Sequence, residues 1–412
     1  MELRKLFGFL PPKFKYFLED LSIEKFPLAK NSILLINKDD KGFGELKLNV
    51  GDSLKSGQKI IFENDEICSF SSVTGVVEEI KEIKWADGKL FTAISIATAK
   101  DDDWDSSLSG EEDLFSKSSG ELLSRLNECG FEFDNTKTVI VSALDVDLLV
   151  SVNQQIIREK SDNIQIGLKL LKQLVGSEKI ILAVSPNLKD IAMKVSGGNA
   201  EVTAIDPVYP NGVPDLLAMK LLNNKGNIGD SVVIGTEYLN AMIESLKTGR
   251  PFVDKVITLI DKEGKPRKNI RARVGTPISE ILKANNITVN DNDKLILGGP
   301  MQGKASYLVD FPITTNIDAI YVQNELNINE YDNTACINCG SCVSICPYNL
   351  QVNLISRYSE FSLFENCNGL NIDCCIECGL CAYVCRSRRP LVQFIQFAKN
   401  EINELRKEES VQ

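Results

Sequence analysis

The chain has 412 residues, a formal net charge of −11 and no histidine. That length is enough for roughly two to four domains with cores of their own. Without histidine, Ser-His-Asp or Cys-His nucleophilic catalysis, histidine-ligated zinc and histidine-ligated haem are excluded. The acidic balance argues against a nucleic-acid-binding surface, which needs a basic stripe. The chemistry must therefore depend on sulfur, carboxylates, lysines or a cofactor.

The N-terminal region, MELRKLFGFLPPKFKYFLEDL, carries charges throughout and has no apolar core of signal-peptide length. No window of about 18 uninterrupted apolar residues exists, so a membrane-spanning helix is not expected. We therefore expect a cytoplasmic protein, which partner proteins would have to attach to any membrane.

The first predicted module, residues 1–99, is an N-terminal segment followed by short strands. The strand-like runs are NSILLI, GELKL, QKIIFE, TGVVEEI and FTAISIAT, separated by Gly, Asp and Asn clusters. Two turns, at 50–58 and 72–77, resemble the barrel-sandwich fold of biotinyl and lipoyl carriers. The second turn lacks the lysine that a carrier needs, so we expect a docking or scaffold module.

Residues 100–119 are polar and acidic, which predicts a linker without enough apolar area to order itself. From 120 to 250 the strand-like runs TVIVSALDV, KIILAVS, EVTAIDP and SVVIG alternate with helical patterns. This alternation predicts a Rossmann-like α/β domain with a parallel sheet covered on both faces. Residues 251–325 carry a ββαβ pattern like a β-grasp (SLBB-like) domain. The whole chain is thus predicted to be multidomain, α/β and α+β.

The last predicted domain, 326–412, repeats the pattern C-x-x-C-x-x-C-x-x-x-C, which is the ligand spacing of paired [4Fe-4S] clusters in a helical ferredoxin-like domain. In two-cluster ferredoxins the fourth cysteine of each run binds the other cluster. The alternatives are a pair of zinc sites, which usually use separated C-x-x-C knuckles, and a disulfide framework, which belongs to small secreted chains. The crossed rule predicts one cluster at Cys336, Cys339, Cys342 and Cys385, and a second at Cys375, Cys378, Cys381 and Cys346.

The remaining cysteines show no pairing pattern. Cys68 lies in a strand pattern and is expected in a core. Cys129 has only Arg125 nearby to lower its pKa. Cys374 is an alternative ligand next to Cys375, and Cys367 is expected to be structural or an exposed thiol without function.

Two further features of this domain concern charge and packing. Arg386, Arg388 and Arg389 place positive charge near a cluster, where it would raise the potential or form a docking patch for an acidic partner; a solvated loop is the alternative. The final helical segment has an apolar face made by Leu391, Phe394, Ile395, Ala398, Ile402 and Leu405. This face is predicted to pack within the chain, with a partner-helix groove as the alternative.

Several short strings occur here in an order that is specific to one family. They are Gly8–Pro12, the turns at 50–58 and 72–77, Tyr209–Gly212, Arg273–Ile278, Gly298–Gly303 and the twin cysteine runs. Together they resemble the C subunit of the Rnf ion-translocating electron-transport complex, over nearly the whole chain. The resemblance implies a peripheral subunit with two [4Fe-4S] clusters that docks on membrane subunits and oxidises NADH through bound FMN.

One stretch departs from the family pattern. Family members carry G-x-G-G-A-G-F-P-T, whose backbone amides approach flavin and nucleotide phosphates without interference from a Cβ. The corresponding stretch here, Arg125–Thr136, has one glycine, and the family's G-A-E-C-E-P is replaced by Ser142–Asp147. Because Glu128, Glu132 and Asp134 would repel a phosphate, FMN and NADH are not expected at the usual place.

The loop Gly298–Gly303 is a candidate for a substitute phosphate cradle. It follows a strand but no helix pattern opens after it, so a tight turn is favoured over a cofactor site.

The sequence therefore predicts an electron-transfer subunit of an Rnf-type membrane complex, without its own NADH/FMN site. Its expected partners are the other subunits and a soluble donor or acceptor: ferredoxin, a flavoprotein or an NADH-linked subunit. Two alternatives remain open. One is an NADH-oxidising FMN/[4Fe-4S] subunit with an altered site, and the other is a soluble adaptor to a corrinoid or amino-acid reductase.

Overall fold

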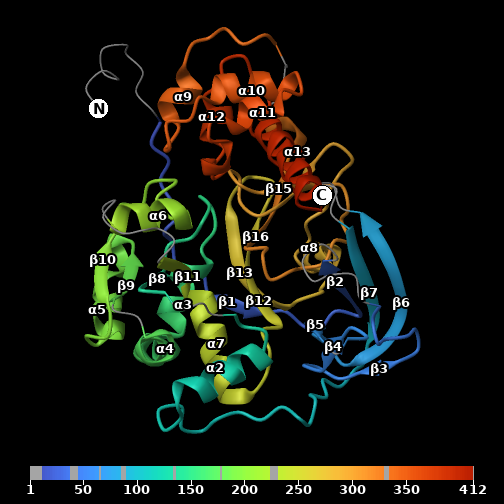
Figure 1. Cartoon of the computed structure of the whole chain (residues 1–412). Coiled ribbons are helices and arrows are strands. Elements are labelled where there is room, and N and C mark those ends of the chain that lie inside the picture. The colour runs from blue at the N-terminus through green and yellow to red at the C-terminus, as the bar shows by residue number, and fades with distance from the viewer. Residues whose placement is uncertain are drawn as a thin grey trace. The chain divides into compact units, whose positions relative to one another are not determined.

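The computed structural model describes residues 12–37, 45–64, 66–84, 90–132, 136–176, 179–222, 231–328 and 334–411 (Figure 1). The chain is a mixed α/β protein that divides into two compact units. The cysteine unit comprises Met1–Lys15, Val208–Pro210 and Leu326–Gln412, and the main unit comprises Tyr16–Pro207 and Asn211–Glu325. No helix among the described residues combines the length and the apolarity that crossing a membrane requires.

The first part of the main unit is antiparallel. A sheet of order β2-β7-β6-β3 contains β2 (Asn31–Asn37), β3 (Ser53–Leu54), β6 (Gly75–Lys84) and β7 (Leu90–Thr98), and β4 (Lys59–Ile61) pairs with β5 (Ile67–Phe70). Alternate residues such as Leu34, Ile36, Ile94 and Ile96 point into one core, as the period of a half-buried strand requires. The predicted strand GELKL is wrong: its described residues make only an isolated bridge, from Leu46 to Phe62.

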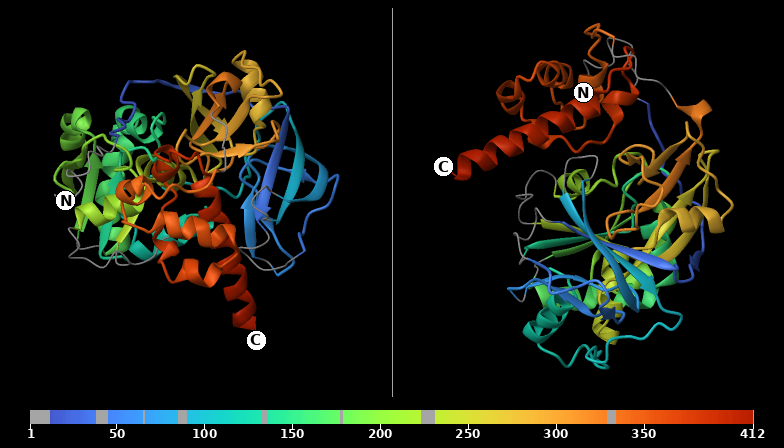
Figure 2. Two further views of the ribbon diagram at one scale, coloured as in Figure 1. Left: turned by 90° about the horizontal axis from the view of Figure 1, so that it is seen from above. Right: turned by 90° about the vertical axis from the view of Figure 1, so that its right-hand side faces the viewer.

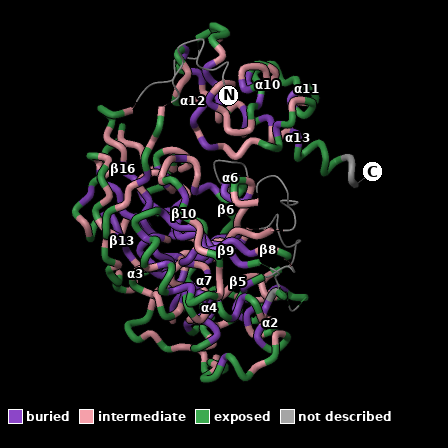
Figure 3. Tube along the Cα trace, turned by 90° about the vertical axis from the view of Figure 1, so that its left-hand side faces the viewer, coloured by how far each residue is buried: buried purple, intermediate pink, exposed green. Residues whose placement is uncertain are grey.

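A parallel sheet of order β10-β9-β8-β11 follows. Its strands are β8 (Thr138–Ser142), β9 (Lys179–Val184), β10 (Glu201–Ala204) and β11 (Ser231–Gly235), and the helical segments between and around them are α2 (Ser119–Glu128), α3 (Val152–Glu159), α4 (Ser161–Val175), η1 (Pro186–Leu188), α5 (Lys189–Ser196), α6 (Pro214–Leu221) and α7 (Thr236–Thr248). Figure 3 shows buried residues concentrated along β8 and β9. Both faces of the sheet are therefore covered, as the sequence predicts.

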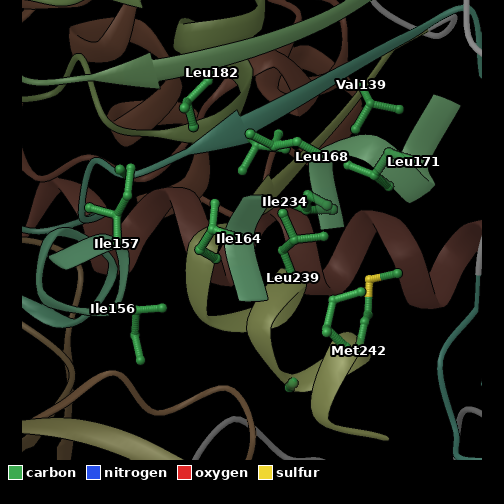
Figure 4. Close-up of a cluster of buried hydrophobic side chains, with 14 of the residues drawn as sticks. Val139, Ile156, Ile157, Ile164, Leu168, Leu171, Leu182, Ile234, Leu239 and Met242 are labelled. Atoms are coloured by element: carbon green, nitrogen blue, oxygen red, sulfur yellow. The ribbon is translucent and has the colours of Figure 1, made fainter. Parts of the chain in front are cut away.

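Successive residues of β8 enter different cores. Val139 and Val141 pack with Leu168 and Leu239 of the helices on one face (Figure 4). Ile140 packs with Leu217 of α6 on the other face. Because β9 and β10 lie on one side of β8 and β11 on the other, the strand order reverses between β8 and β11. In open α/β sheets such a point is where ligands bind, beyond the carboxyl ends of the strands.

A mixed sheet of order β1-β13-β12-β16-β14-β15 completes the main unit. It contains β1 (Ile23–Lys25), β12 (Asp254–Ile260), β13 (Pro266–Arg273), β14 (Lys294–Leu297), β15 (Lys304–Ser306) and β16 (Ala319–Gln323), and α8 (Ile278–Ala284) contributes Ile278, Ile281 and Leu282 to its core. The predicted ββαβ set is present, and β1, β15 and β16 extend it.

The acidic segment 100–118 packs against the main unit. Asp102 forms an ion pair with Arg273 at 2.6 Å, and the Trp104 ring lies 4.0 Å from the guanidinium of Arg250. Leu114 is buried in the same core as β8. The expectation that this segment lacks the means to order itself is wrong, because several of its acidic side chains form ion pairs and Leu114 is buried.

The cysteine unit is built from short helices and one long helix. They are α9 (Ser341–Ile345), α10 (Val352–Glu360), α11 (Phe364–Asn368), η4 (Ile372–Cys374), α12 (Leu380–Tyr383) and α13 (Leu391–Val411). Figure 2 shows α13 as the long helix that ends at the C-terminus. Leu391, Ile395, Ala398 and Ile402 are buried in the core that also contains Ile355 of α10, whereas Leu405 is 45% exposed. The predicted intramolecular packing of this face is confirmed for those four residues.

Candidate metal centre

The two cysteine runs repeat the same backbone conformation. Asn338 and Glu377, each before the second cysteine of its run, have φ of 53° and 52°. Gly340 and Gly379, each after that cysteine, have φ of 72° and 74° and cap the short helices α9 and α12. Left-handed backbone is rare for residues other than glycine and asparagine, so its recurrence at matching positions marks two equivalent ligand loops.

The first group of thiols combines three cysteines of the first run with the last cysteine of the second. Burial, together with the neighbouring thiols Cys336, Cys339 and Cys385, raises the pKa of Cys342 to about 11. Cys339 differs from Cys342. Hydrogen bonds with the Ser341 hydroxyl and amide, and to a smaller extent the charge of Arg386, hold the pKa of Cys339 below the usual value.

The second group combines three cysteines of the second run with the last cysteine of the first. Cys346, Cys375, Cys378 and Cys381 line one small cavity of ≈ 20 Å³ with Pro347, Tyr348 and Val392 among its walls. Burial raises the pKa of Cys378 to about 12, with contributions from Cys375 and Cys346. Burial also raises the pKa of Cys381 far above its ordinary value, and the other thiols add to the rise.

Such groups have the donor chemistry of an iron-sulfur cluster. Buried thiols repel one another as thiolates, and a bound metal centre removes that penalty because thiolates are its ligands. Within the described residues, no three histidine, cysteine, aspartate or glutamate side chains lie close enough to hold a metal ion as they stand. The residues present fit a pair of [4Fe-4S] clusters by type, number and grouping.

Backbone amides point at two of these sulfurs. The Glu377 amide lies 3.4 Å from Cys375 Sγ, and the Arg389 amide lies 3.4 Å from Cys385 Sγ. Hydrogen bonds of this kind stabilise a thiolate and raise the potential of a bound cluster. One amide follows its cysteine by two residues and the other by four, so the two thiol groups receive these hydrogen bonds at different places.

The second ligand loop is fastened by residues distant in sequence. Lys399 of α13 donates to the Cys375 carbonyl at 2.6 Å and to the Glu377 carboxylate at 3.0 Å. The Tyr209 hydroxyl donates to the Cys378 carbonyl at 2.7 Å. The sequence pattern includes Tyr209 only within a family string and does not indicate this role. Its separation of 169 residues from Cys378 leaves no local signal.

The three arginines after the second run have different surroundings. Arg389 is 3% exposed, and it pairs with Glu360 at 2.5 Å and donates to the Thr334 carbonyl. Arg386 and Arg388 are exposed. The predicted patch therefore loses Arg389, which stabilises the fold of the unit.

The four remaining cysteines are separate from both groups. Cys367 is fully buried and its thiol donates to the Ile355 carbonyl, which agrees with a structural role. Cys374 is exposed, and Cys68 is half-buried in β5. Cys129 is buried, and burial raises its pKa.

The stretch that replaces the family's glycine-rich loop is the end of α2 and its cap. The amides of Cys129, Gly130 and Phe131 donate to the carbonyls of Arg125, Asn127 and Leu126. Phe131 is buried and its ring packs against Tyr238. These three amides are thus already bonded to backbone carbonyls. Residues 133–135, including Asp134, lie outside the described residues, as do Gly8–Pro11 of the family strings.

The loop Gly298–Gly303 is a tight turn between β14 and β15, as predicted. Its amides of Met301 and Gln302 donate to the Asp147 carboxylate at 3.0 Å and 2.7 Å. Asp147 is 3% exposed, and burial raises its pKa although these amides oppose the rise. The chain's own carboxylate thus occupies the place where this loop could hold an anion.

Asp145 makes a similar contact two residues earlier. Its carboxylate accepts from the Asn153 amide at 2.7 Å and from Gln154 Nε2 at 3.1 Å, at the start of α3. Complete burial raises the pKa of Asp145 to about 7. The replacement of the family's acidic motif by Ser142–Asp147 therefore supplies two buried carboxyl groups that bind backbone amides.

A cavity of ≈ 170 Å³ lies where the strand order reverses, at the ends of β8 and β11. Its walls include Gly235, Glu237, Lys255 and Asp318. Lys255 pairs with Glu237 and, at 2.7 Å, with Asp318. Burial opposes the charge of Lys255, but the two carboxylates outweigh it and raise its pKa. Both acids that pair with this lysine are thus themselves part of the cavity wall.

Comparison with known proteins agrees with the cysteine chemistry. The 4Fe-4S binding domain family matches residues 330–350. The C subunit of the Na(+)-translocating ferredoxin:NAD(+) oxidoreductase complex of Acetobacterium woodii is 28% identical over 275 residues, 64% of this chain and 62% of that protein. The C subunit of the ion-translocating oxidoreductase complex of Citrobacter koseri is 24% identical, over 98% of this chain and 61% of that protein. The aligned part thus spans about three fifths of the length of these relatives.

Solved structures add only a weak likeness. Two crystal structures of NAD+-reducing [NiFe]-hydrogenase, air-oxidized and H2-reduced, match with TM-scores of 0.38 and 0.40 and identities of 13% and 12%. They cover 57% and 67% of this chain and 45% and 58% of those chains. The resemblance seen in the sequence is confirmed by the curated homologues, which are C subunits of ion-translocating oxidoreductase complexes.

Proposed function

We propose that this chain, a homologue of the C subunits of ion-translocating oxidoreductase complexes, is an electron-transfer subunit that relays electrons through two [4Fe-4S] clusters. Its location would be the cytoplasmic face of the cell membrane, held there by partner subunits. The observation that carries the proposal is the gathering of eight thiols into two crossed groups. Each group takes three cysteines from one run and the fourth from the other, as the two-cluster spacing rule requires.

The ligands follow from this grouping. One cluster would be held by Cys336, Cys339, Cys342 and Cys385, and the other by Cys375, Cys378, Cys381 and Cys346. When bound, such clusters accept and donate single electrons. The chain's own residues position the thiols, bury Cys378 and Cys381 of the second group and direct amides at Cys375 and Cys385.

The absence of an NADH/FMN site is part of the proposal. At the usual place the described amides are bonded within α2 and its cap. In the loop Gly298–Gly303 they bind Asp147, and the cavity beside β11 contains the paired Lys255. Electrons would therefore come from another protein.

The division of the chain is proposed at the boundaries read from the sequence. A barrel-sandwich module would occupy 1–99, a Rossmann-like domain 120–250, a β-grasp domain 251–325 and the ferredoxin-like domain 326–412, with 100–119 between the first two. The separate antiparallel, parallel and mixed sheets support this division, and one buried cluster joins the parallel sheet to one face of the mixed sheet.

The test is a pair of matched serine variants of the full chain, purified without oxygen. Cys385→Ser is expected to disturb the cluster of the first run, although Cys385 belongs to the second. Iron content should fall from about eight toward about four per chain, and one of two dithionite-induced paramagnetic signals should change. Cys374→Ser, next to a ligand and outside both groups, should change neither.

Two results would overturn the proposal. Zinc in place of iron, or no paramagnetic signal after dithionite treatment, would remove the relay altogether. If Cys385→Ser instead altered the signal that Cys375→Ser alters, the clusters would be ligated run by run and the crossed assignment would be wrong.

A further inference from the structure

The two ligand loops differ in how well they are covered. In the second loop, Cys378 is 8% exposed and is fastened by the Tyr209 hydroxyl. In the first loop, none of residues 334–340 is buried. Ile337, between two ligands, is 62% exposed, and Cys339 is exposed. A centre held by the first loop therefore lies at the protein surface.

Free positive charge lies beside this exposed loop. Arg386 directly follows the ligand Cys385 and is exposed. Arg388 is exposed two residues later, in a left-handed conformation with φ of 47°. Within the described part of the chain, neither has an acidic partner, whereas Arg389 pairs with Glu360. Arg386 and Arg388 thus remain available to an acidic partner, although the chain as a whole has a formal net charge of −11.

We propose that the loop 334–340, together with Arg386 and Arg388, is the docking surface for a small acidic electron-carrier protein. The inference rests on the proposed relay and adds which of the two centres exchanges electrons with that partner. One electron would cross this surface between the partner's redox centre and the centre held by the first loop, with no bond made or broken. The exposed Ile337 would supply the apolar anchor, and the arginines would steer the partner.

An anionic membrane is the competing occupant, and the chemistry favours a protein. Lipid surfaces are recognised by clusters of about 4–8 basic residues or by an amphipathic helix. Here two arginines surround a single exposed isoleucine. Protein interfaces between electron carriers are small, and complementary charge gives them speed and orientation.

The experiment measures binding of an acidic two-cluster bacterial ferredoxin to the full chain with its clusters in place, by calorimetry at 50 mM and 500 mM NaCl. The variant Arg386→Glu/Arg388→Glu should weaken binding about tenfold or more at low salt, and the difference should shrink at high salt. The control Lys189→Glu/Lys194→Glu makes the same change in charge on α5, at two exposed lysines. It should bind like the wild type.

A neutral variant separates docking from folding. Arg386→Gln/Arg388→Asn keeps a residue that tolerates the left-handed conformation at 388, and it should show an intermediate loss. Ile337→Asp should weaken binding at both salt concentrations. Iron content and the dithionite-induced signals, measured on each variant, report the clusters independently.

The outcomes distinguish this inference from the relay. Wild-type affinity in both arginine variants, no binding of the ferredoxin by the wild type, or arginine-dependent binding of vesicles containing anionic lipid instead of the ferredoxin would each overturn the docking surface. Normal iron content with those results would leave the relay standing. A wild type without clusters would overturn the relay itself.

Discussion

Asp145 and Asp147 are acidic side chains that accept hydrogen bonds from the chain's own backbone amides. Asp147 binds the amides of the loop Gly298–Gly303, and the Cβ that Gly299 lacks would lie 2.3 Å from the Asp147 carboxyl carbon. The glycine thus permits an acid to enter the turn. The glycine in this string therefore has a structural role that does not require a nucleotide.

The buried carboxyl of Asp145 should make stability depend on pH. Its folded-state pKa of about 7 lies above the ordinary value of about 3.9, so the folded chain holds a proton there that the unfolded chain releases. This contribution is present at low pH and is lost as the pH rises from about 4 through 7, by up to roughly 4 kcal/mol. Asp145→Asn should remove the dependence.

Denaturant unfolding of both proteins at pH 5 and pH 8 checks this expectation. The stability of Asp145→Asn relative to the wild type should increase between the two pH values. The control Asp190→Asn, at an exposed position of α5, should not change with pH in this way. A constant difference between Asp145→Asn and the wild type would mean that Asp145 stays ionised in the fold.

At the scale of elements, α13 both contributes to the core of the cysteine unit and holds the second ligand loop. The face with helical spacing packs Ile395 against α10, while Lys399 on the same helix fastens the second ligand loop. Loosening α13 should therefore loosen the loop as well.

Ile395→Ala tests this coupling. Ile395 is fully buried, and the change should cost about 2–4 kcal/mol through lost burial and a cavity. Hydrogen exchange should accelerate in α10 and at the amides of residues 375–379. The control Leu405→Ala, at a position 45% exposed on the same helix, should change stability by no more than about 0.5 kcal/mol. Faster exchange in α13 alone would show that the loop is held independently.

Elements made by local patterns could be predicted from the sequence, whereas long-range contacts could not. The sequence predicts the buried strand at Val139–Val141 and the spacing of the α13 face, and the structure adds that this strand's side chains enter two cores. Three other features join residues more than a hundred positions apart. They are the pairing of β1 with β13, the contact of Asp147 with Met301 and the ordering of 100–118. The composition of that last segment predicts a linker, but the segment is ordered by contacts such as the ion pair between Asp102 and Arg273.

For the candidate site the same distinction holds. Cysteine spacing predicts the crossed sets because a cubane fixes the geometry of its ligands. It does not predict which loop is open, since Tyr209 and Lys399 cover the second loop from 169 and 24 residues away. The burial of Arg389 is likewise a consequence of Glu360, 29 residues earlier.

At the scale of the whole molecule, the thiol groups and the places considered for a nucleotide lie in different units of the chain. The cysteine unit contains the two thiol groups, and the main unit keeps a parallel sheet whose reversal point is lined by Glu237, Lys255 and Asp318. If those acids and the bonded amides exclude FMN phosphate, NADH cannot deliver electrons directly. A donor protein must then supply them one at a time.

This expectation is tested on the full chain with its clusters, incubated without oxygen with FMN and then NADH. After gel filtration no FMN should remain bound, and NADH should leave the visible cluster absorbance and the paramagnetic spectrum unchanged, while dithionite reduces the clusters. A homologous protein that carries the glycine-rich loop, treated in the same way, should retain flavin and be reduced by NADH. Stoichiometric FMN retention with NADH-dependent reduction in this chain would instead establish an altered flavin site, because a relay without a flavin has no means to split a hydride into single electrons.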